Sequence, residues 1–148
     1  MDFELSDEQK MFRDLFRGFA EKEVAPQAEH EDRSEEPPLT LFAKAAAQGF
    51  MGATLPEAYG GAGLDYLTYS LLVEEISRQS LSFGAALGIH TMLSAMTILE
   101  AGSEAQKQAY LPRLAGGELG TFALTEPEAG SDPGAMQTTA VRENGGYR

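Results

Sequence analysis

The sequence of 148 residues contains no cysteine and no tryptophan, and it is poor in basic residues. Without cysteine the chain can form no disulfide, no thiolate metal site and no cysteine nucleophile. Its 11 lysines and arginines are outnumbered by 23 acidic residues, which leaves a formal net charge of -12. Because this charge repels phosphate backbones and anionic lipid headgroups, we expect neither nucleic acid nor a membrane surface as a partner.

Several common catalytic and metal-binding patterns are also missing. The only histidines, His30 and His90, are too far apart in the sequence for metal-ligand spacing, so we expect no metal site. A Ser/His/Asp triad is compatible with the residue types, but the chain has no GxSxG motif. His90 stands in an apolar stretch and is interpreted as a satisfied core histidine, with a pocket-lining role as the alternative. Gly60, Gly61 and Gly63 do not match GxGxxG, which favours a structural turn.

Export and membrane segments are not predicted either. The N-terminal sequence MDFELSDEQK lacks the basic and apolar regions of a signal peptide, so we expect a cytoplasmic protein. Residues Leu81 to Leu99 carry no Asp, Glu, Lys or Arg and are long enough to cross a bilayer. Polar residues interrupt this stretch, and no positive flank sets a topology. We therefore predict a bundle helix that is buried on most sides.

The rest of the first 115 residues is typical of a helical bundle. Hydrophobic residues make up 43% of the chain and charged residues 23%, as in soluble folded proteins. Ser6 and Gln9 form a capping box for a helix that should end near Pro26. A solvated acidic connector is predicted for residues 29–36. The apolar face of the first helix comprises Phe12, Leu15, Phe16, Phe19 and Val24.

Capping signals predict three further helices. Together with the helix that begins at Ser6 and the apolar stretch, they make at least five predicted helices. One covers residues 39–48 and closes at Gly49, and another begins after Asp65 and runs to about Ser77. The last begins at the capping box of Ser103 and Gln106, carries Tyr110, Leu111 and Leu114, and ends near Gly116 and Gly117. The inward residues of the helix after Asp65 are expected to be Leu67, Leu71, Leu72 and Ile76. The pair Gly84 and Gly88 predicts a close approach between helices.

The pattern changes near residue 118. Residues 120–125 and 138–141 have the composition of strands, and a loop rich in Gly, Pro, Ser and Asp separates them. Asn144-Gly145-Gly146 predicts a hairpin turn. We therefore predict an all-α domain at residues 1–117 and the beginning of a β-domain at residues 118–148.

The loop between the two predicted strands carries the most specific motif. Residues Ala123 to Ala135 read ALTEPEAGSDPGA. This segment closely resembles the first signature of the acyl-CoA dehydrogenase family and meets every specified position of it. The flanking sequences LSDEQKMFRDLFRGFAEKEVAP, LPEAYGGAGLD and GSEAQKQAYLPRLAGGE are also similar to the family, so the resemblance covers nearly the whole chain.

The chemistry of this segment is consistent with a cofactor wall. A strand leaving Phe122 offers backbone polar groups and the Thr125 hydroxyl to the edge of a flat heterocycle. Gly130 permits close backbone approach, and Ser131 can donate to a pyrophosphate without Lys or Arg. The alternative from the residues alone is an ordinary strand, turn and strand. Glu126 and Asp132 are expected to bind the amides of their own loop.

The resemblance implies a flavoprotein fold and activity. It implies a mainly α chain, with an N-terminal helical bundle followed by the first strands of a truncated β-barrel domain. FAD contacts are implied for Phe122, Ala123, Leu124, Thr125, Gly130 and Ser131, and Ser131 is also implied to contact the acyl-CoA substrate. The face of Leu87 to Ile98 is a candidate border of the acyl chain.

The implied reaction is α,β-desaturation of an acyl-CoA thioester, in which β-hydride passes to flavin, as in fatty acid β-oxidation. We expect the catalytic glutamate and a Trp-Ile-Thr segment to lie beyond residue 148, so no residue here is nominated as catalytic. The implied partners are an electron-transfer flavoprotein and further copies of the chain in a homotetramer. The alternatives are a non-catalytic helical assembly module and an acyl-CoA oxidase-like flavoprotein.

Overall fold

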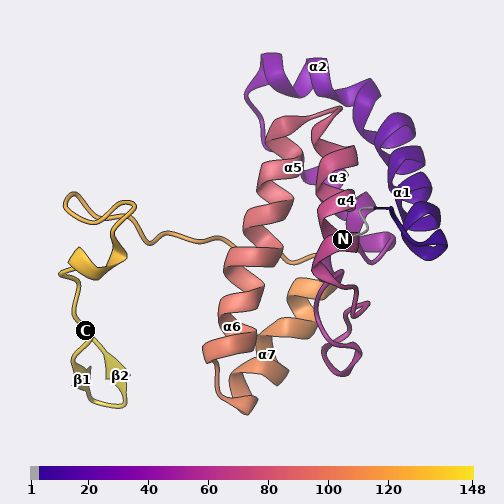
Figure 1. Ribbon diagram of the computed structural model, residues 1–148. Coiled ribbons are helices and arrows are strands. Elements are labelled where there is room, and N and C mark those ends of the chain that lie inside the picture. The colour runs from indigo at the N-terminus through magenta and orange to yellow at the C-terminus, as the bar shows by residue number, and fades with distance from the viewer. Residues whose placement is uncertain (1–3) are drawn as a thin grey trace.

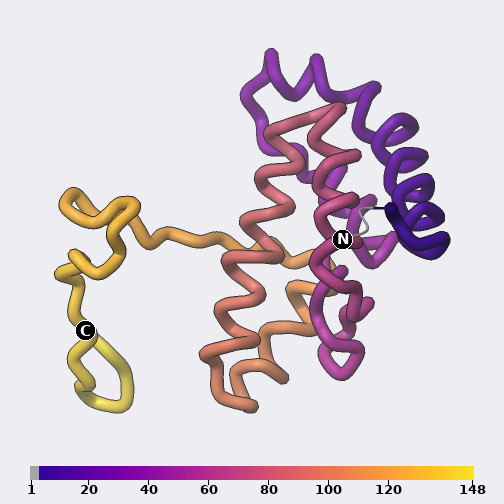
Figure 2. The backbone as a smooth tube through the Cα atoms, in the orientation of Figure 1, coloured from indigo at the N-terminus to yellow at the C-terminus, as the bar shows by residue number. Residues whose placement is uncertain are grey.

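The computed structural model describes residues 4–148, so the first three residues of the acidic N-terminal sequence lie outside the described part. Figure 1 shows a bundle of helices and, beside it, a small C-terminal lobe joined to it by an extended segment. The smooth backbone trace in Figure 2 shows the same two parts. The prediction of a mainly α chain is confirmed.

The first helical run is longer than predicted. Helix α1 (Asp7–Phe19) starts at the Ser6–Gln9 capping box and continues through the π-helix η1 (Ala20–Val24) into α2 (Ala25–Ser34). The predicted end at Pro26 and the predicted loop from residue 29 are therefore wrong. Pro26 lies in the first turn after the π-helix, where a missing N–H is tolerated, and Arg33 pairs with Glu29 one turn earlier.

Helix α3 (Leu39–Ala47) ends as predicted, because Gly49 adopts the left-handed conformation with φ of 77°. Two short 3-10 helices follow, η2 (Phe50–Gly52) and η3 (Glu57–Tyr59). The glycine loop then folds back on η2, and Leu64 N–H donates to the Ala53 carbonyl at 2.8 Å. The prediction of a structural turn at these glycines agrees with this arrangement.

Helix α4 (Tyr66–Ser77) is capped by Asp65, which accepts the Thr68 N–H at 2.9 Å. Leu71, Leu72 and Ile76 are buried as predicted, but Leu67 is 51% exposed, so its predicted inward position is wrong. It lies in the first turn of the helix, where its neighbours Asp65 and Tyr66 are exposed as well.

The apolar stretch forms one continuous run from Leu81 to Ala101, made of α5 (Leu81–Gly88), the π-helix η4 (Ile89–Ala95) and α6 (Met96–Ala101). It is long and apolar enough to cross a membrane, but the core helix of a soluble protein can have the same length and composition. Phe83, Leu87 and Ala95 are buried, whereas Ile89 and Leu93 are each 42% exposed. The prediction of burial on most sides is therefore wrong, because neighbours cover one face only.

The sequence predicted a close helix approach at Gly84 and Gly88, and the structure shows one only at Gly84. A Cβ on Gly84 would lie 3.1 Å from the Ser77 Cβ, so α5 touches α4 there. A Cβ on Gly88 would meet nothing within 4 Å. Gly88 instead lines an open groove between the same two helices.

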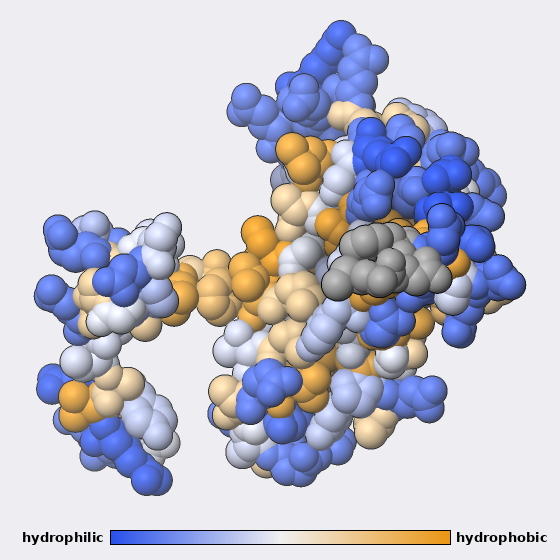
Figure 3. Space-filling view, viewed as in Figure 1, coloured by the Kyte–Doolittle hydropathy of each residue, from blue (hydrophilic) through white to orange (hydrophobic). Residues whose placement is uncertain are grey.

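Two clusters of buried side chains hold the bundle together. The larger cluster joins α1, α3, α4 and α5, with Phe16 packed edge-on against Phe50 and Phe42 against Phe83. The smaller one joins Leu55 to Leu111 and Leu114 of α7 (Glu104–Ala115), which starts at the predicted Ser103 capping box. In Figure 3 the surface over α2 is strongly hydrophilic, which agrees with a helix that has no buried residue.

An ion pair lies between α1 and α4. The Arg17 guanidinium donates to both oxygens of Glu75, at 2.8 Å and 3.1 Å, and the Glu75 side chain is 3% exposed. The hydrogen bond from Arg17 is the main cause that lowers the Glu75 pKa, with smaller contributions from the charges of Arg17, Arg78 and Arg13. Because Glu75 is buried, its charge depends on this bidentate partner.

Replacing Glu75 with Gln is expected to reduce the free energy of unfolding by about 1–2 kcal/mol at neutral pH, because two charge-assisted hydrogen bonds become weaker. The pKa of Glu75 is lower in the folded chain, so its contribution is present above the ordinary value of 4.5 and is lost as the pH falls through the folded pKa. Urea unfolding at neutral and at acid pH measures this difference. Glu74→Gln at an exposed pair is the control. An equal loss at both pH values would contradict the prediction.

The C-terminal lobe contains less strand than predicted. Residues 120–125 and 138–140 form no strand, so the predictions of strands at 120–125 and 138–141 are wrong, except that Val141 pairs with Arg148 beside the hairpin. Strands β1 (Arg142–Glu143) and β2 (Gly146–Tyr147) form the predicted hairpin, with Asn144 and Gly145 at positive φ. A strand needs a hydrogen-bonding neighbour, and within residues 121–148 such pairing is limited to the hairpin, the flanking pair Val141 with Arg148 and an isolated bridge between Glu126 and Ala129.

Candidate functional site

The predicted flavin-binding residues lie on the segment that leaves the bundle and on the loop after it. Phe122 and Leu124 are 37% and 44% exposed, and Ala123, Thr125, Gly130 and Ser131 are also exposed. Figure 3 shows apolar surface along this connecting segment. The predicted site residues are therefore accessible to a ligand, and they are neighbours because they are close in sequence.

Two carboxylates hold the loop in shape. Glu126 accepts the backbone N–H groups of Gln137 at 2.8 Å and Thr138 at 3.1 Å, and Asp132 accepts the Gly134 N–H at 3.1 Å. The hydrogen bond from Gln137 is the main cause that lowers the pKa of Glu126. The sequence-based expectation for Glu126 and Asp132 agrees with these contacts, since both bind amides of their own loop.

Replacing Glu126 with Ala is expected to increase amide hydrogen exchange at Gln137 and Thr138, because both N–H groups lose their acceptor. The melting of the bundle should stay unchanged, since Glu126 contacts only its own lobe. Exchange measured by mass spectrometry on peptides that cover residues 126–140 tests this expectation. Glu128→Ala is the matched control, and equal exchange in both variants would contradict the prediction.

The polar groups of this segment are available to a ligand. Within the part of the chain that the structure describes, the backbone groups of residues 121–125 make no hydrogen bond. A Cβ added to Gly130 would meet no atom within 4 Å, so the space beside it is open. Free amides, carbonyls and the hydroxyls of Thr125 and Ser131 match the needs of a flavin ring edge and a pyrophosphate. These residues therefore fit FAD.

An apolar groove lies between α4 and α5–η4, on the exposed face of the long helical run. Its volume is about 490 Å³, and its walls are mostly hydrocarbon. Tyr66, Tyr69 and Val73 contribute from α4, and Ile89 and Leu93 contribute from the other side. Ile89 and Leu93 belong to the face that the sequence indicated as a candidate acyl border.

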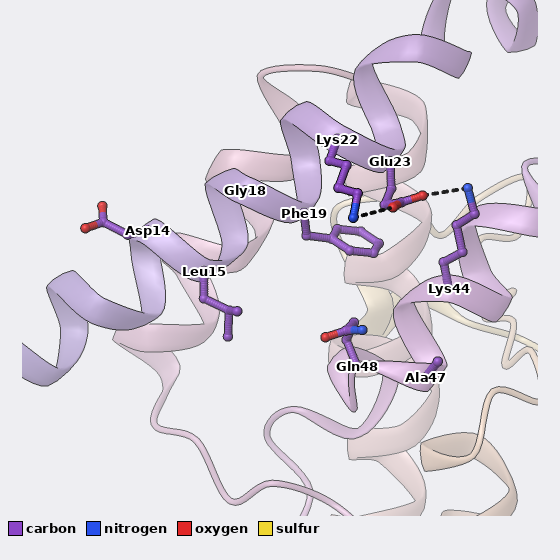
Figure 4. A pocket seen from close by; sticks show the side chains of 9 residues that line it. All are labelled: Asp14, Leu15, Gly18, Phe19, Lys22, Glu23, Lys44, Ala47 and Gln48. Atoms are coloured by element: carbon purple, nitrogen blue, oxygen red, sulfur yellow. Dashed lines mark ion pairs between the residues drawn. The ribbon is translucent and has the colours of Figure 1, made fainter.

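A second groove, of about 570 Å³, lies between α1–η1 and α3 (Figure 4). Lys44 contacts Glu23 at 2.7 Å and Lys22 lies 3.9 Å from it, so two lysines share one carboxylate at the groove wall. The hydrogen bond from Lys44 is the main cause that lowers the Glu23 pKa. None of the predicted site residues lines this groove.

Two features of the site region were not predicted. The outward position of Ile89 and Leu93 depends on which neighbours cover the helix, although their spacing of one helical turn was visible in the sequence. The contact between His90 and Gly120 joins residues 30 apart, and no sequence signal pairs them. Among residues 4–148, no group of three His, Asp or Glu side chains is arranged to hold a metal ion.

Comparison with known proteins agrees with this helical fold and signature loop. The model for the N-terminal domain of acyl-CoA dehydrogenases matches residues 6–118. An acyl-CoA dehydrogenase of Bacillus subtilis is 47% identical over 97% of this chain and 38% of its own length. The chain belongs to the acyl-CoA dehydrogenase family.

Solved structures agree with this assignment. A structure from a study of the electron transferring flavoprotein of Acidaminococcus fermentans matches with a TM-score of 0.91 and 44% identity, over 99% of this chain and 39% of that chain. Butyryl-CoA dehydrogenase from Megasphaera elsdenii matches with a TM-score of 0.86 and 38% identity, over 99% of this chain and 40% of that chain. The chain thus spans about 40% of the length of the relatives it matches.

Proposed function

We propose that this chain is the N-terminal portion of an FAD-dependent acyl-CoA dehydrogenase, an oxidoreductase that converts acyl-CoA thioesters to 2,3-enoyl-CoA. The observation that carries the proposal is the segment 122–131, in which the backbone groups of residues 122–125 and 130–131 are exposed and make no hydrogen bond among the described residues, and whose loop is stabilised by Glu126 and Asp132. Relatives named acyl-CoA dehydrogenases support the proposal.

The proposed roles of the residues follow from their chemistry. The Thr125 hydroxyl and the backbone of Phe122, Ala123 and Leu124 bind the edge of the isoalloxazine ring. The amides at Gly130 and Ser131 bind the pyrophosphate, and Ser131 also touches the acyl-CoA. When bound, FAD supplies the acceptor for the β-hydride of the substrate. The residues of this chain bind and orient FAD and the acyl-CoA substrate, and we assign none of them as catalytic.

The apolar groove beside α4 is proposed to border the acyl chain. Its walls can exclude water from an alkyl group, which is the main source of affinity for such a substrate. Ile89 and Leu93 support this role, because they line the groove together with the exposed Tyr66, and a contiguous exposed apolar patch marks a ligand groove.

Other parts of the proposal come from the family. The glutamate that takes the α-proton is proposed to lie outside these residues. An electron-transfer flavoprotein is the proposed electron acceptor, and a homotetramer in the cytoplasm is the proposed assembly and location. Residues 1–117 are proposed as the helical domain and 118–148 as the start of the β-domain.

The experiment is an anaerobic titration of the purified polypeptide of full family length with acyl-CoA thioesters of graded chain length. We expect a yellow protein whose flavin absorbance is bleached by at least one thioester. A colourless protein, or one that no acyl-CoA bleaches, would contradict the proposal and favour an assembly module. Rapid reaction of the reduced flavin with oxygen would favour an acyl-CoA oxidase. The 148-residue chain alone is expected to retain little FAD, because it offers one side of the site.

A further inference from the structure

His90 is a buried polar residue whose two ring nitrogens differ. Nδ1 accepts a hydrogen bond, whereas Nε2 has no hydrogen-bond partner among the described residues, so the prediction of a satisfied core histidine holds only in part. It lies in the π-helix η4, and its side chain is 1% exposed, whereas His30 on α2 is exposed. A π-helical turn widens the helix and changes the direction of its side chains, and such turns are frequent at functional sites. The position of His90 in this turn therefore points to a role beyond filling the core.

The imidazole of His90 contacts the segment that leaves the bundle. Its Nδ1 accepts the backbone N–H of Gly120 at 3.0 Å. A ring nitrogen that accepts a hydrogen bond carries no proton, so the proton of the neutral ring lies on Nε2. Burial lowers the pKa of His90, and the backbone carbonyls of Met51 and Leu114 act in the opposite direction. The contact thus requires, and the surroundings favour, the neutral ring.

Gly120 is the point where the chain separates from the bundle. A Cβ on Gly120 would lie 2.8 Å from the Ser94 Cβ and 3.2 Å from Leu114 Cδ2, so the backbone is pressed against η4 and α7. Beyond Gly120, every hydrogen bond made by residues 121–148 has its other partner in the same range, among the described residues. The bond from Gly120 to His90 is therefore the last hydrogen bond between the bundle and the C-terminal lobe among the described residues.

We infer that His90 is a positioning residue, whose Nδ1 fixes the direction in which residues 121–125 leave the bundle and thereby places the loop from Thr125 to Ser131. The second part of this inference rests on the proposed flavin site, whereas the first part does not. The competing explanation is that the ring only fills volume in the core. The two explanations differ in one respect, because only the positioning role needs a hydrogen-bond acceptor at Nδ1.

A pair of substitutions with opposite properties separates the two roles. His90→Phe keeps the ring volume and removes the acceptor, whereas His90→Asn loses volume but keeps a side-chain oxygen close to the position of Nδ1. We expect amide exchange in peptides covering residues 117–125 to increase about tenfold in the Phe variant and to stay near the native rate in the Asn variant. Native exchange in the Phe variant, or an equal increase in both, would overturn the inference.

A second set of variants tests the same contact from the other side and covers the case in which the His90 variants do not fold. Gly120→Ala forces the segment away from Ser94 while His90 and the amide are both retained. Adding Ser94→Gly opens the space that the new methyl group needs. We expect faster exchange at residues 117–125 in the single variant and recovery in the double variant. Unchanged exchange in Gly120→Ala would overturn the inference.

FAD binding by the polypeptide of full family length tests the consequence for the site. We expect His90→Phe to weaken FAD binding about tenfold and His90→Asn to leave it near the native value. If the Phe variant shows faster exchange but native FAD affinity, the placement of the loop by His90 is overturned. If the native protein binds no FAD while the exchange results hold, the proposed function fails and the positioning of residues 121–125 by His90 stands.

Discussion

Substitution of Gly61 by Ala is expected to destabilise the bundle by about 3 kcal/mol, the upper end of the cost of overpacking. A Cβ on Gly61 would overlap the carbonyl group of Leu55 and lie 2.5 Å from the Leu55 Cβ. The backbone cannot move away, because Gly61 N–H donates to the Pro56 carbonyl and Gly63 N–H donates to the Leu55 carbonyl. Leu55 is itself fully buried against α7, so the strain reaches the smaller core cluster.

Two other glycines provide controls for this substitution. A Cβ on Gly63 would meet nothing within 4 Å, but its φ is 64°, so Ala there should cost about 1 kcal/mol from backbone strain alone. Gly18 lies in α1 with open space around it, and Ala there should stabilise the helix by roughly 0.5–1 kcal/mol. Chemical unfolding of the three variants measures their free energies of unfolding, which should rank Gly18→Ala highest, Gly63→Ala next and Gly61→Ala lowest. A Gly61 variant as stable as the Gly63 variant would show that the loop accommodates the methyl group.

Substitution of Gly130 by Val is expected to weaken FAD binding by the polypeptide of full family length on the order of 100-fold, or about 2.7 kcal/mol. Gly130 has no positive φ, and a Cβ there would meet no atom of the chain within 4 Å. The chain itself therefore does not require glycine at this position. If a pyrophosphate approaches this backbone as proposed, a branched side chain occupies its space.

The control is the stability of the same variant without FAD. Gly130→Val should unfold at the native urea concentration when FAD is removed, and Gly130→Ala should show a smaller loss of FAD affinity. Equilibrium titration by flavin fluorescence measures the affinity. Native affinity in the Val variant would remove Gly130 from the proposed site, and an equal loss of stability without FAD would assign the glycine a structural role.

Local sequence signals predicted most helix boundaries well. The capping boxes at Ser6 and Ser103, the Asp65 cap and the left-handed Gly49 all depend on residues within one turn of each other, so they can be read without the fold. The turn at Asn144 and Gly145 is equally local. The loop contacts of Glu126 and Asp132 also connect residues of one short segment.

One error, at Pro26, has a local cause, and the others arose where a distant element decides the outcome. A proline normally ends a helix because it has no N–H to donate. Here Pro26 lies directly after the π-turn, which accommodates the lost hydrogen bond, and α2 continues. Leu67 and Ile89 are apolar residues at helical positions that neighbouring elements cover only in part. Residues 120–125 have strand composition but no neighbouring strand among the described residues, and extended backbone without a partner forms no sheet.

The sequence by itself determined the family, the mainly helical fold and the segment from Ala123 to Ala135 as the candidate cofactor wall, because these depend on local patterns and on a contiguous motif. The tertiary structure alone decided which face of Leu81–Ala101 stays open and that His90 meets Gly120. Burial and long-range hydrogen bonds are properties of packed elements, and the residues that form them lie far apart in the chain.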